Sequence, residues 1–377
     1  MFSIAPRPRL GTRLAFLIAG FGTACWAPLV PYAKARLSIG PDELGLLLLC
    51  LGLGSLFAML LVGPVCARVG ARPVILGGAV GMVAVLPALA IAGSALGLGM
   101  ALALFGASLG AIDAAMNIHA AEVEQAENRP LMSGFHALFS LGGFAGSAMM
   151  SLLLARVGHP FTATVVGAAL MAIALVVAWP NFLRTRVPDD QPHFALPRGT
   201  VLALSLLAAI TFLAEGALLD WSALLITERG LVDVSQGGTG YMFFAIAMTV
   251  GRLSGDALIA RLGERRMLFC GGLIAVAGFA MLLLANAAAP AMLGSILIGL
   301  GAANIVPVLF SLAGRQKRMP PALAIAALTT TGYAGVLCGP AAIGAIAAFT
   351  GLSNAFWMLA ALLLLVPICA RLVTRGT

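Results

Sequence analysis

Twelve long apolar runs follow one another along this chain, and each is long enough to cross a lipid bilayer. A spanning helix needs about 20 apolar residues, so the runs leave almost nothing for a water-soluble domain. The composition agrees, since 61% of the 377 residues are hydrophobic and only 10% are charged. A soluble enzyme, a disordered protein and a nucleic-acid-binding protein are excluded, because no soluble fold can bury so much apolar surface.

The runs predict an all-α membrane protein with twelve transmembrane helices, whose bounds are set to within several residues. The predicted spans are 11–33, 43–66, 73–94, 96–120, 131–155, 159–183, 199–226, 235–260, 266–287, 290–313, 321–347 and 352–373.

The distribution of basic residues predicts the orientation of these helices. An even number of spans places both termini on one side of the membrane. The tails and loops on that side hold 17 of the 22 Lys and Arg residues, and the opposite loops hold 4. Cytoplasmic loops carry the excess of Lys and Arg. We therefore expect both termini in the cytoplasm and attribute the net charge of +8 to these loops rather than to a nucleic-acid partner.

The chain also predicts its own division into two pseudo-symmetric halves. The longest polar stretch, 184–198, falls after the sixth span and is interpreted as a cytoplasmic linker between six-helix bundles at 1–183 and 199–377. The sequence after the second span, 67–72, reads ARVGAR, and that after the eighth, 260–265, reads ARLGER, 193 residues later. Internal repeats of this kind are typical of secondary transporters.

The first of these loops resembles the loop motif of the major facilitator superfamily, G-x-x-x-D-R-x-G-R-R. The matching positions are Gly63, Ala67, Arg68, Gly70 and Arg72. The acidic position is an alanine here and in the second half, so the usual charge relay of the loop is incomplete. The resemblance covers essentially the whole chain and implies two bundles that rock between inward-open and outward-open states.

Spans four and five resemble the fucose:proton symporter family more closely, in the branch that includes the membrane protein of bacterial rhizopine loci. The matching segments read DAAMN at 113–117 and FHALFSLGG at 135–143. That family places a protonatable acid four residues before a sugar-binding Asn, and a polar side chain early in span five also touches the sugar. The resemblance implies these roles for Asp113, Asn117 and His136. The second acid that the family carries in span one is missing here.

Few charged residues lie within the apolar runs, where each costs at least about 2.5–3.5 kcal/mol. Asp113 is the strongest candidate for proton coupling, because removal from water disfavours the charged form of a carboxyl group. Asn117 lies one turn further on the same face, and its amide suits a hydroxylated ligand. The alternative is a structural hydrogen bond from Asp113 to another helix.

Span seven carries two further candidates for proton coupling, Glu215 and Asp220. At 3.6 residues per turn they point about 140° apart, so they do not form one carboxylate pair. Trp221 offers either an aromatic surface for a sugar or an anchor at the membrane interface.

Three further residues are candidates for substrate binding. His136 either titrates near neutrality, bonds a ligand or bonds locally. Asn304 precedes Pro307, whose missing N–H loosens a helix, so this point is either a polar lining or a kink. Tyr333 ends a polar run of three threonines, Thr329–Thr331, whose hydroxyls can instead bond their own helix.

The remaining charged residues predict gating or structural contacts. Arg252 and Asp256 form an i, i+4 pair in span eight. Four more arginines stand in the two repeated loops: Arg68, Arg72, Arg261 and Arg265.

These features favour a secondary transporter of a small polar solute, sugar- or cyclitol-like, driven by protons. One alternative is a proton-driven exporter of amphipathic or toxic compounds, although span five lacks the proline of the exporter motif GPxxGG. Another is a receptor or assembly protein that keeps the fold without transport. We find no P-loop, HExxH or GxSxG motif, and the six cysteines form no CxxC pair. We expect a monomer in the bacterial inner membrane, with no enzymatic activity, cofactor, metal site or nucleic-acid partner.

Overall fold

The computed structural model describes residues 7–184, 196–233 and 236–375, and every regular element in these ranges is a helix. Within the described residues, twelve helical segments are long and apolar enough to cross a membrane, which confirms the predicted number of spans. A helix suits a membrane interior, which offers no water to the backbone, because each N–H and C=O is bonded within its own segment. Most of the predicted linker, 185–195, lies outside the described residues.

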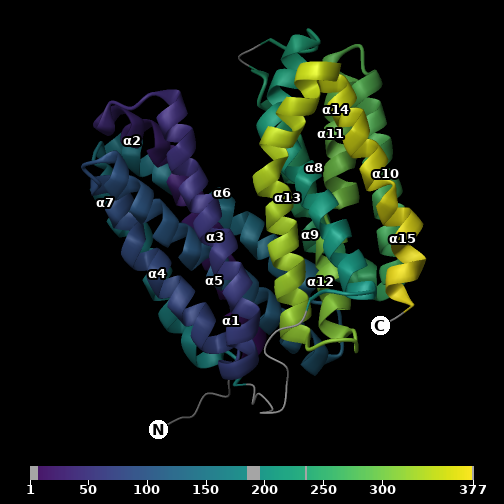
Figure 1. Cartoon of the computed structure of the whole chain (residues 1–377), viewed down its shortest axis with the longest axis horizontal. Helices are drawn as coiled ribbons and strands as arrows, with labels where there is room; N and C mark the ends of the chain where they lie inside the picture. The colour runs from purple at the N-terminus through teal and green to yellow at the C-terminus, as the bar shows by residue number, and fades with distance from the viewer. Residues whose placement is uncertain (1–6, 185–195, 234–235, 376–377) are drawn as a thin grey trace. The chain divides into compact units, whose positions relative to one another are not determined.

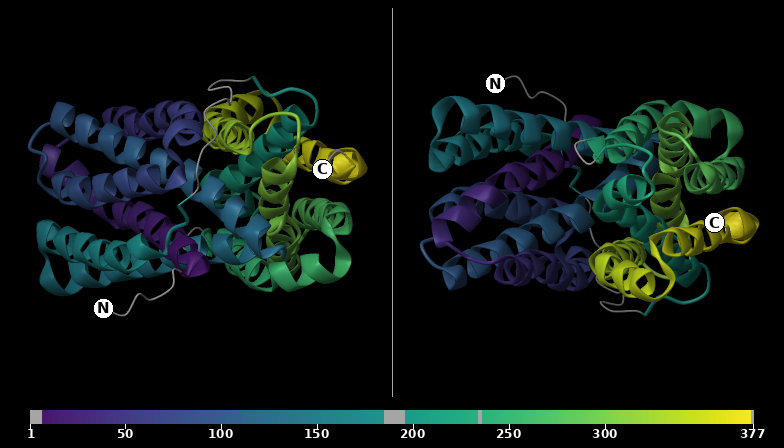
Figure 2. Two further views of the ribbon diagram at one scale, coloured as in Figure 1. Left: turned by 90° about the horizontal axis from the view of Figure 1, so that it is seen from below. Right: turned by 90° about the horizontal axis from the view of Figure 1, so that it is seen from above.

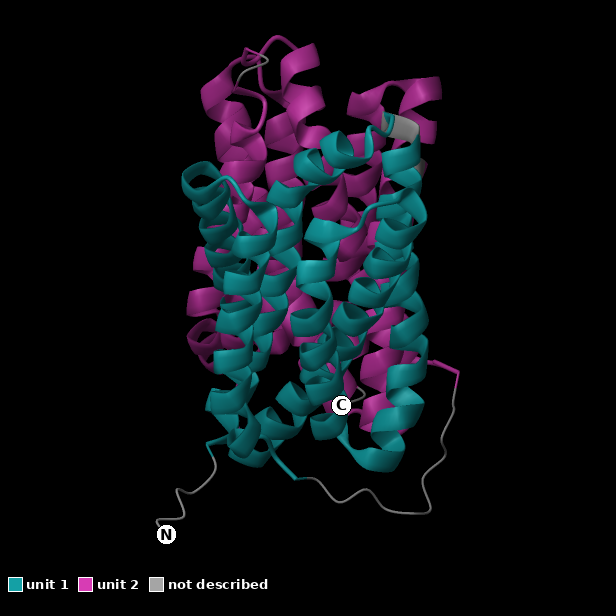
Figure 3. Ribbon diagram, turned by 90° about the vertical axis from the view of Figure 1, so that its left-hand side faces the viewer, with its two compact units in different colours: residues 1–127, 138–195 teal, residues 128–137, 196–377 magenta. Residues whose placement is uncertain are grey.

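The chain divides into two compact units (Figure 3). Unit 1 comprises residues 1–127 and 138–195, and unit 2 comprises 128–137 and 196–377. The boundary therefore passes through one helix, α6 (Met132–Val157), whose first six residues belong to unit 2 and whose remainder belongs to unit 1.

Unit 1 contains the helices of the first half of the chain (Figure 1). They are α1 (Pro8–Trp26), the 3-10 turn η1 (Ala27–Leu29), α2 (Val30–Leu37), α3 (Pro41–Val69), α4 (Ala71–Ile91), α5 (Ala95–Glu127), the larger part of α6, α7 (Pro160–Ala178) and the 3-10 turn η2 (Trp179–Asn181). Helix α5 packs against both α3 and α4, and α4 also packs against α7.

Unit 2 contains the helices of the second half. They are α8 (Thr200–Glu228), α9 (Thr239–Leu262), α10 (Glu264–Leu284), α11 (Ala288–Ala302), α12 (Ile305–Arg315), α13 (Pro321–Thr350), α14 (Leu352–Leu363) and α15 (Leu365–Thr374). Helix α8 packs against α13, and α11 packs against α9 and α10. Figure 2 shows the helices of each unit side by side from two further directions.

The two units repeat the same local devices at a spacing of 193 residues. Gly70 and Gly263 each end one helix and begin the next, with φ of 79° and 78°. This left-handed conformation is open to glycine at little cost, so it permits an immediate turn between spans. The loop repeat found in the sequence therefore has the same backbone geometry in both halves.

Arginine caps provide a second repeated device. The Arg36 guanidinium donates to the carbonyls of Leu89 and Ala92 at the end of α4, at 2.9 and 3.0 Å. The Arg229 guanidinium donates to those of Leu282 and Ala285 at the end of α10, at 2.8 and 2.7 Å. The donor and both acceptors in the first half each lie 193 residues before their counterparts in the second half. The last carbonyls of a helix lack intrahelical partners, so each arginine satisfies groups that lipid could not.

Close helix contacts are also repeated. A Cβ atom added at Gly106 in α5 would collide with the backbone carbonyl of Leu51 in α3. One added at Gly299 in α11 would collide with that of Phe244 in α9. Both pairs are again 193 residues apart. Without a side chain at these points the helix backbones approach each other directly, as small residues allow in membranes.

We expect Gly106→Ala to destabilise the protein by about 1–3 kcal/mol, because the added methyl group must push α5 away from α3. The check is the melting temperature of the detergent-purified protein. Gly77→Ala is the matched control, since Gly77 lies inside α4 with no atom within 4 Å of the added Cβ position. Equal melting temperatures for the two variants would show that the close contact contributes nothing.

Candidate functional site

In unit 1 the candidate site centres on two polar side chains of α5. Asp113 is half-buried, and its carboxylate forms no hydrogen bond or ion pair with any described residue. Asn117 is 1% exposed, and its Nδ2 donates to the Asp113 backbone carbonyl at 2.9 Å. Its Oδ1 atom is buried and has no partner among the described residues. A structural bond from Asp113 to another helix, the alternative considered above, is therefore not found in the described part of the chain.

A third polar residue of α5, His119, makes structural contacts instead. Its Nε2 accepts the Leu183 N–H at 2.9 Å, and its Nδ1 lies 3.0 Å from the Thr12 hydroxyl. The imidazole is fully buried and its ring meets Phe182 edge-on. His119 thus ties α5 to α1 and to the segment after α7, and both of its ring nitrogens are used.

In unit 2 the candidate site is built where the tenth span is interrupted. Helix α11 ends at Ala302 and α12 begins at Ile305, with Ala303 and Asn304 between them. Pro307 explains the break, because a proline has no N–H to offer the carbonyl four residues earlier, at Ala303. Unit 1 has Ala114 at the position 193 residues before Pro307, and α5 runs through it without interruption.

Helix α9 satisfies the broken helix by exchanging two side-chain bonds with it. The Arg252 Nε donates to the free carbonyl of Ala303 at 3.3 Å. In return the Asn304 Nδ2 donates to the Gly251 carbonyl at 3.0 Å. Asn304 is 4% exposed, and its Oδ1 has no partner within the described ranges. The sequence predicted either a polar lining or a kink at Asn304. The structure shows a kink there, and the Asn304 Oδ1 atom remains available as a hydrogen-bond acceptor.

Arg252 is also paired with Glu215 of α8. Their Nη2 and Oε2 atoms lie 3.6 Å apart, and the side chains are 9% and 19% exposed. The other carboxylate oxygen, Oε1, is buried and has no hydrogen-bond partner among described residues. When two charges are buried, their mutual attraction and their hydrogen bonds must replace the hydration that each has lost. Glu215 replaces only part of it, because its Oε1 atom has no hydrogen bond with any described residue.

Asp256 reaches the beginning of α6, in the part that belongs to unit 2. Its two carboxylate oxygens accept the Gly134 N–H at 3.2 and 3.1 Å. The first N–H groups of a helix lack intrahelical partners and attract negative charge. The contact of α6 with α9 through Gly134 and Asp256 was not predicted, because sequence spacing carries no signal for it.

The imidazole of His136, two residues after Gly134, is buried. The centre of its ring lies 5.6 Å from that of Phe310 in α12.

Other candidate residues lie apart from this cluster. Asp220 is exposed on α8, on a different face from Glu215 as the helical angle predicted. Trp221 packs against α13, where a methyl group added at Gly344 would meet its ring at 3.2 Å. Tyr333 is half-buried on α13.

The arginines of the two repeated loops differ in their surroundings. Arg72 places its guanidinium 4.3 Å from the centre of the Trp179 ring, a cation–π contact within unit 1. Arg68, Arg261 and Arg265 are exposed. Their gating role stays a prediction.

A family model described as the Major Facilitator Superfamily matches residues 13–321. The chain belongs to the major facilitator superfamily. It is thus a multi-pass membrane transporter of that family, which confirms the resemblance drawn from the sequence.

Relatives along the whole chain agree with this assignment. An uncharacterised MFS-type transporter of Yersinia pestis is 48% identical over 97% of this chain and 96% of its own length. An uncharacterised transporter of Sinorhizobium fredii is 31% identical over 98% of both chains. The membrane protein MosC of Rhizobium meliloti is 31% identical over 90% of this chain and 84% of its own.

Solved structures show the same fold. The human organic anion transporter MFSD10 (TETRAN) superposes with a TM-score of 0.76 at 16% identity, covering 96% of this chain and 98% of its own. The fucose:proton symporter FucP of Escherichia coli gives 0.75 at 15% identity, covering 97% of each chain. At these identities the likeness establishes the fold of a major facilitator protein and no more.

Proposed function

We propose that this major facilitator protein is a proton-coupled secondary transporter of a small polyhydroxylated solute, sugar- or cyclitol-like. It would work by alternating access as a monomer in the bacterial inner membrane, with both termini in the cytoplasm. The observation that carries the proposal is the pair formed by Asp113 and Asn117. Both groups keep unused hydrogen-bonding capacity within an apolar span, where that capacity is costly.

Asp113 has the properties of a proton carrier. Its carboxylate has no basic partner among the described residues, so no ion pair fixes it in the charged form. A carboxyl group can bind and release one proton per cycle, and ionisable residues inside a membrane commonly mark proton pathways. The fucose:proton symporter, a structural neighbour, supports proton coupling as the energy source.

Asn117 has the properties of a solute ligand. Its Nδ2 is held by the backbone, whereas its buried Oδ1 can accept a hydrogen bond. A hydroxyl group of a sugar or cyclitol is a suitable donor. The position follows Asp113 by one helical turn, so proton binding and solute binding would take place on one face of α5.

Glu215 is the second proton-binding group that we propose. Protonation would remove its attraction for Arg252 and leave the guanidinium bonded to Ala303. Deprotonation would restore the pair. The contacts that Arg252 makes at the interrupted helix would therefore change with the protonation state of Glu215.

The proposal is tested by a thermal-shift screen of the detergent-purified protein at two pH values. The panel contains hexoses, inositols, amino-cyclitols and lipophilic cations. We expect a polyhydroxylated compound to raise the melting temperature, since a ligand of the folded state stabilises it by mass action. Stabilisation by lipophilic cations alone would instead indicate the exporter.

We expect Asn117→Ala to weaken binding of that compound about tenfold, because one buried hydrogen bond to the solute is lost. Isothermal titration gives the affinity. Asn354→Ala is the matched control, since the Asn354 Nδ2 makes the same bond four residues back, to the Thr350 carbonyl, on an exposed surface. If the two variants bind the solute equally well, Asn117 is not a ligand.

A further inference from the structure

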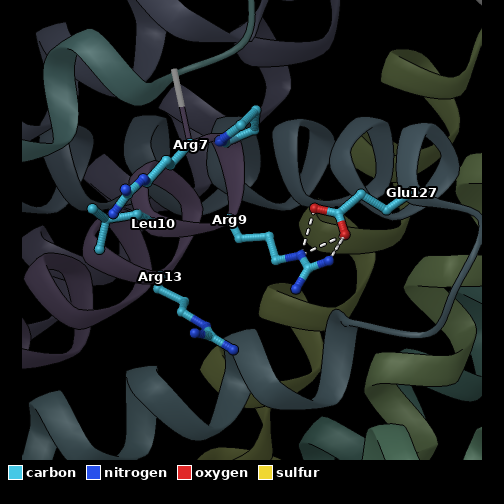
Figure 4. Close-up of a pocket in the computed structure, with 6 residues that line it drawn as sticks. Arg7, Arg9, Leu10, Arg13 and Glu127 are labelled. Carbon is cyan, nitrogen blue, oxygen red and sulfur yellow. Dashed lines mark hydrogen bonds and ion pairs between the residues drawn. The ribbon is translucent and has the colours of Figure 1, made fainter. Parts of the chain in front are cut away.

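Unit 1 contains a basic pocket that the transport proposal does not use. It lies at the start of α1 and measures about 360 Å³. Its lining consists of Arg7, Pro8, Arg9, Leu10, Arg13 and Glu127 (Figure 4). Three arginines thus share a pocket with one carboxylate, so the charge within it is strongly unbalanced.

Two of the three guanidinium groups are available to a ligand. Arg9 is bound to Glu127 through several hydrogen bonds and an ion pair. The side chains of Arg7 and Arg13 are exposed and form no hydrogen bond or ion pair with any described residue. The first turn of α1 holds no acidic residue that would offset their charge. Like charges that line one pocket repel each other, and a bound anion would reduce that repulsion.

The position of the pocket indicates what kind of anion reaches it. Helix α1 opens the first membrane span, which begins at Pro8. The start of a span lies at the level of the lipid headgroups. Pro8 and Leu10 add apolar surface to the lining, and Leu10 is 37% exposed. The pocket therefore offers cations beside apolar contacts, as an amphipathic anion requires.

We propose that this pocket binds the phosphate group of an anionic phospholipid. The planar guanidinium groups of Arg7 and Arg13 suit the oxygens of a phosphate. Basic residues beside a membrane span attract anionic lipids. Leu10 would contact the glycerol and upper acyl chain. The Arg9–Glu127 pair would hold the start of α1 against the end of α5 and so keep the pocket open.

The test is a thermal-shift titration of delipidated, detergent-purified protein with phosphatidylglycerol, phosphatidylcholine or inorganic phosphate. We expect phosphatidylglycerol to stabilise the protein more than phosphatidylcholine, and inorganic phosphate to have little effect. We expect R7Q/R13Q to weaken phosphatidylglycerol binding about tenfold or more, from the loss of two basic contacts. High salt should weaken binding to the wild type.

The matched control is R266Q/R371Q, which removes the same charge from two exposed arginines of unit 2 that have no partner in the described part of the chain. It should bind phosphatidylglycerol as the wild type does. The single variants R7Q and R13Q are measured too, so the comparison holds if the double variant does not fold. Wild-type affinity in R7Q, R13Q and the double variant would overturn the proposal. Equal stabilisation by inorganic phosphate and phosphatidylglycerol would overturn the assignment to a lipid.

Discussion

Replacing Asp113 by Asn is expected to abolish uphill transport of the solute while leaving exchange intact. The amide has nearly the shape of the carboxyl group and keeps its polarity, so the solute site one turn away should survive. It cannot bind and release a proton, however, so the proton gradient loses its connection to solute movement. The protein would then carry solute only down its own gradient.

The size of this effect follows from the energy in the gradient. A difference of two pH units stores about 2.7 kcal/mol per proton, which supports about 100-fold accumulation at one proton per solute. We expect proteoliposomes with wild-type protein to approach that ratio and those with Asp113→Asn to reach no accumulation. The measurement uses the polyhydroxylated compound identified by thermal shift.

Asp233→Asn is the control for this variant, since Asp233 is an exposed acid in the connection between α8 and α9. Counterflow of labelled solute shows whether the altered protein still exchanges. Proton-driven accumulation that persists in Asp113→Asn would remove Asp113 from the coupling mechanism. Glu215→Gln, assayed alongside, then shows whether the coupling carboxyl group lies in α8 instead.

Replacing Arg252 by Met is expected to destabilise the protein by about 3 kcal/mol, the cost of leaving one member of a buried pair alone. The loss would leave the Glu215 carboxylate without its ion-pair partner at Oε2, while its Oε1 already has no hydrogen-bond partner among the described residues. It would also remove the Arg252 bond to the Ala303 carbonyl, which Pro307 cannot replace. Two defects would therefore meet at the interrupted helix.

A double-mutant cycle separates these two contributions. Adding Glu215→Gln to Arg252→Met removes the stranded charge, so we expect the double variant to recover more than half of the lost stability. Arg266→Met, at an exposed position of α10, is the control and should leave the melting temperature nearly unchanged. An Arg252→Met protein as stable as this control would show that the ion pair is not a structural element. Additive losses in the double variant would show that the two side chains do not interact.

The sequence by itself determined the features that depend on neighbouring residues along the chain. The apolar runs predicted twelve spans, because a membrane selects segments by length and hydropathy. The 193-residue repeat of one loop predicted a two-fold internal similarity, and the structure then showed arginine caps at Arg36 and Arg229 with the same spacing. The polar candidates were also found this way, since a charge within an apolar run stands out without any structure.

Only the tertiary structure decided which of these candidates meet. The structure joins Arg252 to Glu215 of α8 by a salt bridge and Asp256 to a backbone amide of α6, two contacts that the i, i+4 spacing of Arg252 and Asp256 could not predict. It also placed the helix break at Ala303 and Asn304 and grouped residues 128–137 with unit 2. Helical periodicity fixes the face on which a side chain emerges, whereas its partner depends on which helix packs against that face. That choice depends on contacts between segments far apart in the chain, so no local pattern in the sequence records it.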